Sequence, residues 1–214
     1  IWIIANPDAA DIPDIAAWLS GLVPDFDWLG LSDHRIAIME TIEINANWKV
    51  LIEGGLEAYH FRIAHKNTIG PHFPDNLLTY CQFGPHMRAV LPRNAMPELG
   101  NTPEEDWELR KDANLVYTLM PNTQMLVQQD HFMWFLIEPV SVTVVPKSAP
   151  RTDEMEKHWQ TNHRISVTAL KEDFEIGEEI QAGFASRGNP SHLFGRFEGA
   201  LNRFNLTIEE MLAS

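Results

Sequence analysis

Residues 115–145, LVYTLMPNTQMLVQQDHFMWFLIEPVSVTVV, decide the predicted fold of this chain. Apolar, aromatic and β-branched residues fill three runs in this stretch, and each run is long enough for a strand. The runs cover 115–120, 123–129 and 132–145. Because only the short turn signals Pro121-Asn122 and Asp130 separate them, the three strands should pair as antiparallel neighbours.

Two strands and a helix are predicted upstream of this stretch. Alternating isoleucines over 35–44 predict a half-buried strand, although Glu40 interrupts its apolar face, and residues 87–91 predict a second strand. Asn47 has the character of a helix N-cap, and the apolar residues that follow it as far as Tyr59 recur at helical spacing. A helix should therefore connect the first strand to the rest of the sheet.

A long helix is predicted downstream, from Asp153 to Arg187. Asp153-x-x-Glu156 resembles a capping box at its start, and Gly188-Asn189-Pro190 ends it. A shorter helix is predicted over 193–205, where aromatic residues recur at helical spacing. This order of elements indicates an α+β domain whose helices pack on an antiparallel sheet.

The composition excludes several classes of protein. The chain has 214 residues, 44% of them hydrophobic, and a formal net charge of −14, so it can bury a core and would repel nucleic acid and anionic lipid. No run reaches about 18 apolar residues, so no membrane-spanning helix is expected. Cys81 is the only cysteine, which excludes an internal disulfide and any iron–sulfur cluster held by two cysteines of this chain. The absence of disulfides favours a cytoplasmic location.

The helix predicted from Asn47 ends in a segment that contains two candidate metal ligands. The segment is Glu57-Ala58-Tyr59-His60-Phe61-Arg62-Ile63-Ala64-His65. Residues five apart on an ideal helix differ by about 140° in direction, so His60 and His65 converge only if the helix ends or bulges between them. The spacing differs from H-E-x-x-H, in which both histidines share a helical face, and this disfavours a zinc peptidase.

A distant carboxylate is needed to complete a metal site with these histidines. Two neutral histidines and one carboxylate form a facial triad, which leaves coordination positions of iron(II) open for dioxygen and water. Asp173 is the best candidate, because it lies beside the apolar stripe of the long helix, and Glu172 and Glu175 are the alternatives. His158 and His163 repeat the spacing of the first pair and compete with it as a metal site.

Five motifs occur in the order found in a known enzyme family. They are Asn47-Trp48-Lys49, Glu57-x-x-His60-x4-His65, Pro121-Asn122, Glu172-Asp173-x7-Gln181 and Phe194-Gly195-Arg196-x-Glu198. In this order they resemble the catalytic domain of the large (alpha) subunit of Rieske non-heme iron ring-hydroxylating oxygenases. The resemblance covers nearly the whole chain. It implies a helix-grip (START/Bet v 1-like) fold, in which an antiparallel sheet wraps around a long C-terminal helix.

The resemblance also implies roles for four residues. His60, His65 and Asp173 would bind a mononuclear Fe(II), and Glu57 would bridge from an iron-bound histidine to the Rieske cluster of the next subunit in a homotrimer. Such an enzyme uses O2 to hydroxylate, dihydroxylate or demethylate a small aromatic or otherwise largely apolar substrate, with electrons from a ferredoxin or a reductase. No nucleic-acid or membrane partner is expected.

The sequence departs from the family in two places. A [2Fe-2S] Rieske cluster requires two cysteines and two histidines, and the single cysteine of this chain does not supply them. Residues 1–34 are therefore interpreted as a lead-in segment after a missing N-terminal Rieske domain, and 35–214 as the mononuclear-iron catalytic domain, inactive without its cluster domain. Glu53-Gly54-Gly55 stands where family members commonly have Glu-Asn-aromatic.

Two other functions stay open at this point. A helix-grip domain can act as a START-like module that binds a small molecule without catalysis. The same three residues can also hold zinc in a metal-dependent hydrolase. The metal bound, and the presence of an open coordination position, distinguish the three functions.

Overall fold

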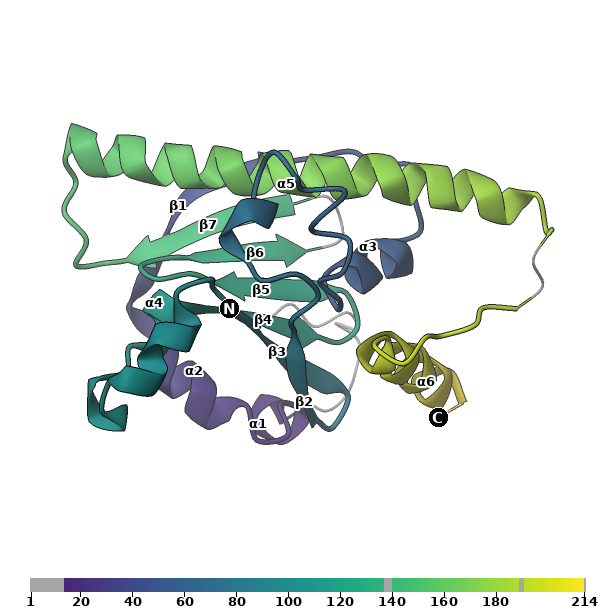
Figure 1. Cartoon of the computed structure of the whole chain (residues 1–214), viewed down its shortest axis with the longest axis horizontal. Coiled ribbons are helices and arrows are strands. Elements are labelled where there is room, and N and C mark those ends of the chain that lie inside the picture. Colours follow the sequence, from purple (N-terminus) through teal and green to yellow (C-terminus); the bar gives the residue numbers. More distant parts are fainter. Residues whose placement is uncertain (1–13, 137–139, 189–190, 214) are drawn as a thin grey trace.

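A seven-stranded antiparallel sheet forms the centre of the molecule (Figure 1). The structure is a computed structural model that describes residues 14–136, 140–188 and 191–213. The strand order is β1-β7-β6-β5-β4-β3-β2, and each neighbouring pair is antiparallel. The strands are β1 (His34–Thr41), β2 (Thr79–Phe83), β3 (His86–Pro92), β4 (Ala113–Leu119), β5 (Thr123–Val127), β6 (Phe132–Leu136) and β7 (Val140–Pro146).

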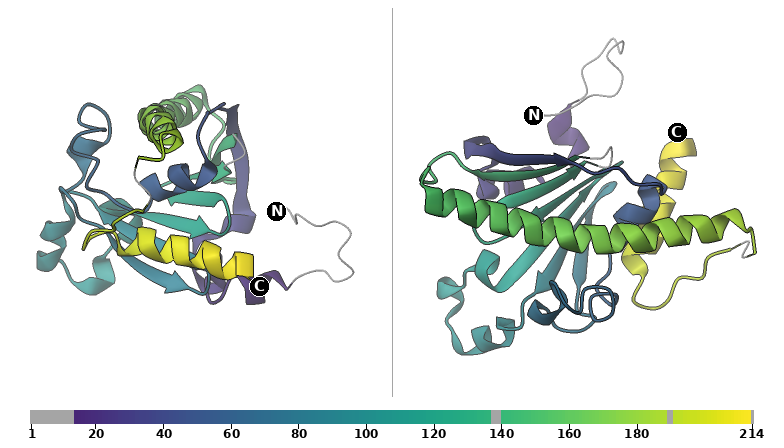
Figure 2. Two further views of the ribbon diagram at one scale, coloured as in Figure 1. Left: turned by 90° about the vertical axis from the view of Figure 1, so that its right-hand side faces the viewer. Right: turned by 90° about the horizontal axis from the view of Figure 1, so that it is seen from above.

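Helices lie on both faces of this sheet. They are α1 (Ile15–Trp18), α2 (Val23–Leu29), α3 (Trp48–Gly54), α4 (Leu109–Asp112), α5 (Asp153–Ala185) and α6 (Gly199–Ala213). The long helix α5 crosses one face, where it contacts β1, β7 and α3 (Figures 1 and 2). Within the described residues, no helix is both long and apolar enough to cross a membrane. These observations confirm the predicted α+β class and the antiparallel sheet that holds a long C-terminal helix.

The two faces of the sheet differ in polarity. On the side of α1 and α2, apolar residues of β4, β5 and β6 such as Tyr117 pack against Leu22 and Phe26, and this is the larger apolar core. Successive strand residues point to opposite faces, and on the side of α3 and α5 the strands present buried polar residues such as Thr118 and Thr143. Gln124 donates to the carbonyl of Ile52 at 3.0 Å on that side. The candidate site described below lies on this more polar face.

The predicted strands are confirmed in the middle of the sheet and wrong at one boundary. Strands β3, β4 and β5 match the predictions for 87–91, 115–120 and 123–129. The single strand predicted over 132–145 is instead the pair β6 and β7, and residues 137–139 between them lie outside the described residues. Strand β2 was not predicted, because four of its five residues are exposed and show no apolar alternation.

Strand β1 starts as predicted, but its apolar face is irregular. Its pairing with β7 shifts between Ile36 and Ile38, so a bulge changes which side chains face inward. As a result Ile36 is 53% exposed. The strand also ends at Thr41, before the last predicted isoleucines.

The predicted helices differ from the structure mainly at their ends. Helix α5 matches the long predicted helix, but its N-cap is Thr152, whose hydroxyl accepts from the backbone N–H of Met155, rather than the predicted Asp153. The helix predicted over 193–205 begins only at Gly199 and continues to Ala213. Residues 193–198 precede it as an irregular segment with a turn, in which the N–H of Glu198 donates to the carbonyl of Gly195 at 3.1 Å. The side chain of Phe197 in this turn is 71% exposed.

The described part of the lead-in segment contains two short helices. The first, α1, covers Ile15–Trp18. Helix α2 was not predicted, and its Phe26 and Leu29 are buried in the core against the sheet. Residues 1–13 of this segment lie outside the described residues.

Candidate metal centre

Helix α3 ends well before the two candidate histidines. Asn47 caps its start by accepting from the N–H of Lys49 at 3.0 Å, as predicted, but the helix stops at Gly54 and does not continue to Tyr59. A Cβ atom on Gly55 would overlap the buried side-chain amide of Gln124. The chain therefore leaves the helix where this strand residue packs against it, and the predicted continuation of the helix is wrong.

The segment after α3 folds into consecutive tight turns. The N–H of Ala64 donates to the carbonyl of His60 at 2.8 Å, and that of His65 donates to Phe61 at 3.1 Å. Gly70 closes the segment by donating to the carbonyl of His65 at 2.9 Å. A Cβ on Gly70 would lie 2.6 Å from the carbonyl oxygen of Phe61, so this close approach requires glycine. We call residues 57–70 the histidine loop.

The histidine loop and α5 bring three ligand atoms together. Oδ1 of Asp173 lies 3.0 Å from Nε2 of His65 and 3.5 Å from Nε2 of His60, and the two Nε2 atoms are 3.2 Å apart. A metal ion with bonds of about 2.1 Å at right angles has adjacent ligands about 3.0 Å apart. The triangle therefore has the size of one face of a metal coordination sphere. The condition for convergence is met because the helix ends before both histidines.

Each histidine is held from behind by a glutamate. Oε1 of Glu57 pairs closely with Nδ1 of His60, and Oε2 of Glu57 accepts from the N–H of Tyr59 at 2.7 Å. Oε2 of Glu172 lies 2.7 Å from Nδ1 of His65. A neutral imidazole that donates its Nδ1–H to such a carboxylate presents a lone pair at Nε2. This is the tautomer that a metal ligand requires.

The carboxylates make this centre attract positive charge. Burial lowers the pKa of His65, but the hydrogen bonds and charges of Asp173 and Glu172 outweigh burial and raise the pKa above its ordinary value. Desolvation raises the pKa of Glu172, but hydrogen bonds from Thr68 and His65 outweigh it and keep the carboxyl ionised to lower pH than usual. A cation bound at the triangle of ligand atoms would interact favourably with the same carboxylates.

The other candidate ligands lie elsewhere. Glu175 is exposed on α5. His158 is exposed beside Asp130, whereas His163 is buried between Thr143 and Glu40, so this second pair does not converge. Among the residues that the structure describes, only His60, His65 and Asp173 form a group of three with metal-ligand geometry.

Two residues of the centre have roles that the sequence did not predict. Thr68 donates its hydroxyl to Oε2 of Glu172 at 2.6 Å, and Glu172 faces His65 from behind rather than joining the triangle. The position of Glu172 directly before Asp173 was the only signal, and it indicated an alternative ligand. Contacts between residues this far apart in the chain have no local pattern that would reveal them.

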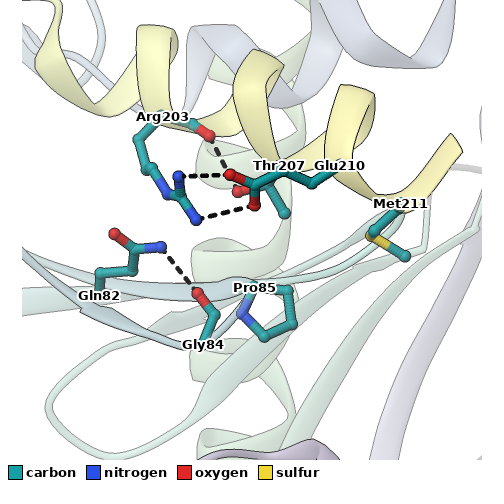
Figure 3. Close-up of a pocket in the computed structure, with 7 residues that line it drawn as sticks. All are labelled: Gln82, Gly84, Pro85, Arg203, Thr207, Glu210 and Met211. Atoms are coloured by element: carbon teal, nitrogen blue, oxygen red, sulfur yellow. Dashed lines mark hydrogen bonds and ion pairs between the residues drawn. The ribbon is translucent and has the colours of Figure 1, made fainter. Parts of the chain in front are cut away.

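An open groove lies at a separate place in the fold. It runs between the β2–β3 turn, at Gly84 and Pro85, and α6 (Figure 3). Arg203 and Glu210, both on α6, form two hydrogen bonds of 3.0 Å with each other along the helical wall of the groove. The groove shares no lining residue with the metal centre.

The antiparallel sheet, the long helix and the three converging side chains occur in one domain, and comparison with protein-family models identifies its family. Residues 31–214 match the model described as ring hydroxylating alpha subunit (catalytic domain). The chain belongs to this family, whose members are Rieske-type oxygenases with a mononuclear non-heme iron. A search of curated proteins found no match.

Solved structures with a similar fold come from the same class. A quaternary ammonium Rieske monooxygenase, CntA, in complex with an inhibitor is 15% identical, with a TM-score of 0.65, and the match covers 95% of this chain and 56% of that one. The same enzyme with L-carnitine gives 14% identity, a TM-score of 0.63, and coverage of 96% and 56%. A Pseudomonas putida CBB5 NdmA mutant with theobromine gives 13% identity, a TM-score of 0.54, and coverage of 94% and 54%. The chain thus spans a little over half the length of these proteins.

Proposed function

We propose that this domain binds one Fe(II) at His60, His65 and Asp173 and catalyses the oxygenation step of a Rieske-type oxygenase. One observation carries the proposal: Nε2 of both histidines and Oδ1 of Asp173 form a triangle with sides of 3.0 to 3.5 Å. Two lone pairs and a carboxylate oxygen converge there, which is an arrangement that a cation stabilises. The family match supports iron rather than zinc.

The three side chains differ in how far solvent reaches them. His65 is 1% exposed, whereas His60 is 17% and Asp173 28% exposed, so a bound metal would be reached past His60 and Asp173 rather than past His65. When bound, ferrous iron supplies the activation of dioxygen for hydroxylation, dihydroxylation or demethylation. The role of the chain's own residues is to bind the ion, to fix the tautomer of both imidazoles, and to keep the inner side of the centre free of water.

Glu57 is proposed to connect the metal centre to the electron source. Its carboxylate receives the Nδ1–H of His60 and the backbone N–H groups of Tyr59 and His60. A carboxylate offers about four acceptor positions, so one remains. We assign that position to a histidine of a Rieske cluster on a neighbouring subunit of a homotrimer, as the family resemblance implies.

The remaining components come from outside these residues. The proposed substrate is a small aromatic or otherwise largely apolar molecule, and the similar solved structures that contain L-carnitine and theobromine support a small organic ligand. Electrons would pass from a ferredoxin or a reductase through a [2Fe-2S] Rieske cluster. The single cysteine in the 214 residues means that this cluster is bound elsewhere.

Anaerobic titration with Fe(II), followed by nitric oxide, tests the proposal. The expected result is about one iron per chain and an iron–nitrosyl electron paramagnetic resonance signal, which requires an open coordination position next to bound iron. His60→Ala and His65→Ala should abolish both, whereas Glu57→Gln should retain both. Binding of zinc alone, or of iron without a nitrosyl signal, would contradict the oxygenase function.

A further inference from the structure

Glu172 occupies a position that the proposed function does not use. The residue directly after it, Asp173, supplies a corner of the ligand triangle, but Glu172 itself lies on the far side of the His65 ring. Oε2 of Glu172 is 2.7 Å from Nδ1 of His65, and Oδ1 of Asp173 is 3.0 Å from Nε2 of the same ring. Two consecutive residues of α5 therefore hold one imidazole by both of its nitrogens.

This arrangement follows from helix geometry. Consecutive residues on a helix project about 100° apart, so two carboxylates at neighbouring positions can diverge around a flat ring. The ring between them is 1% exposed, and no rotation is available to it without breaking one of the two contacts. The position of His65 is thus defined by the position of α5.

The two glutamates that contact the Nδ1 atoms of the histidines lie at different separations from them along the chain. Glu57 is three positions before His60, so this pair lies within one turn of the histidine loop. Glu172 is 107 positions from His65 and connects the loop to a different element. In the described part of the chain, every side-chain hydrogen bond or ion pair that joins the histidine loop to α5 ends on Glu172 or Asp173.

Thr68 strengthens the connection through Glu172. Its hydroxyl donates to Oε2 at 2.6 Å, the same oxygen that receives the Nδ1–H of His65. One carboxylate oxygen thereby joins two residues of the loop to the helix. These contacts form without a metal ion. The three ligand atoms, in contrast, face one another and gain a stabilising partner only when a cation binds.

We propose that Glu172 is a positioning residue that fastens the histidine loop to α5 and pre-forms the metal centre before metal binds. It fixes the His65 ring with Nε2 toward the ligand triangle, so less ordering is left for the binding step. This inference rests on the proposed function only in taking His65 as a metal ligand. It goes beyond that function because it concerns the metal-free protein.

Substitutions at Glu172 separate its charge from its hydrogen bond. Gln retains an acceptor for the Nδ1–H of His65, and Leu removes it. We expect Glu172→Leu to weaken binding of Fe(II), or of Co(II) as a spectroscopic probe, by 10- to 100-fold, which is the usual effect of losing a hydrogen-bond partner of a metal ligand, and Glu172→Gln to weaken it only a few-fold. Thr68→Val should give an intermediate loss. Glu175→Leu and Glu175→Gln, at an exposed position on the same helix, are the matched controls and should bind as the unmodified protein does.

Hydrogen exchange of the metal-free protein provides the second measurement. Glu172→Leu should increase amide exchange in residues 60–70, and Glu175→Leu should leave it unchanged, while the sheet stays protected in both. Equal metal affinity and equal loop exchange in Glu172→Leu and Glu175→Leu would overturn the inference. Loss of protection throughout the sheet in Glu172→Leu would also overturn it, because Glu172 would then stabilise the whole fold rather than the loop. Failure of the unmodified protein to bind metal would refute the proposed function instead, and loop exchange would still report on Glu172.

Discussion

Nε2 of His60 lies 3.2 Å from Nε2 of His65, while the Nδ1 atoms of both rings face glutamates. When each neutral ring donates its Nδ1–H to its glutamate, neither Nε2 can donate to the other. The close approach of two acceptors is unfavourable by itself, and it becomes favourable when a cation lies between them. This relationship connects the turns of the histidine loop to the proposed chemistry.

Metal should stabilise the folded protein, because a ligand that binds only the folded state adds its binding free energy to that of folding. At a free Fe(II) concentration of 100 times Kd the gain is about 2.7 kcal/mol. For a domain of this size that corresponds to a rise in Tm of roughly 5–10 °C. Anaerobic thermal denaturation with and without Fe(II), and again after a chelator, measures the effect. An unchanged Tm would argue against a preformed metal site.

Gly70→Ala should disrupt the centre without touching a ligand. The new Cβ would lie 2.6 Å from the carbonyl oxygen of Phe61 and 2.8 Å from that of His65, so the loop must open. We expect at least a tenfold loss of metal affinity. Gly183→Ala is the control, since nothing lies within 4 Å of its Cβ and alanine favours a helix by about 1 kcal/mol. Equal affinity in the two variants would show that the loop tolerates the added atom.

Gly55→Ala should destabilise the fold through Gln124. The added methyl group overlaps the side-chain amide, which donates to Ile52 at 3.0 Å and to Thr118 at 3.2 Å. Displacing this buried amide should cost about 1–3 kcal/mol. In a Gln124→Ala background the same change should cost much less, and urea denaturation of the four proteins in a double-mutant cycle measures the difference. Additive effects would contradict the contact.

Stability should depend on Asp130 in acid. Desolvation raises the pKa of Asp130, but hydrogen bonds and charges from His131 and His158 outweigh it and lower the pKa to about 2. A carboxyl with a lowered pKa stabilises the folded state above its unfolded pKa of 3.8 and loses that contribution as the pH falls to about 2. The shift corresponds to about 2.4 kcal/mol. Because Asp130 is 46% exposed, solvent screening reduces this to roughly 1 kcal/mol.

Asp130→Asn therefore should lower the free energy of unfolding at pH 7, and the difference from the unmodified protein should shrink as the pH approaches 2. Urea denaturation at several pH values measures this difference. Asp27→Asn, at an exposed carboxyl on α2, is the control and should show no such trend. A difference that is constant with pH would mean that the charge of Asp130 is not the cause.

The sequence predicted those features of the metal centre that depend on the order of residues along a short stretch of chain. The spacing of His60 and His65 predicted two of the three residues whose ligand atoms converge, and Asp173 was the best of three candidates for the third. The long helix was also predictable, because its 33 residues have a regular periodic pattern. The motif order added the family, which residue chemistry alone left open.

The parts that were wrong depend on contacts between distant segments. The predicted helix past Gly54 followed a real apolar stripe, but the side chain of Gln124 occupies the space beside Gly55 and the helix stops. The position of Glu172, on the Nδ1 side of His65, depends on how the histidine loop packs against α5. No spacing of residues in the sequence predicts that packing. An edge strand such as β2, with four of its five residues exposed, likewise carries no apolar pattern to detect.

Iron bound per chain in Asp173→Ala, compared with Glu175→Ala, tests the central claim most directly. Both variants remove a carboxylate from the same helix, but only Asp173 faces the two histidines. After anaerobic reconstitution and removal of excess metal, we predict about one iron per chain in Glu175→Ala and in the unmodified protein, and almost none in Asp173→Ala. Full iron occupancy in Asp173→Ala would contradict the proposed metal centre.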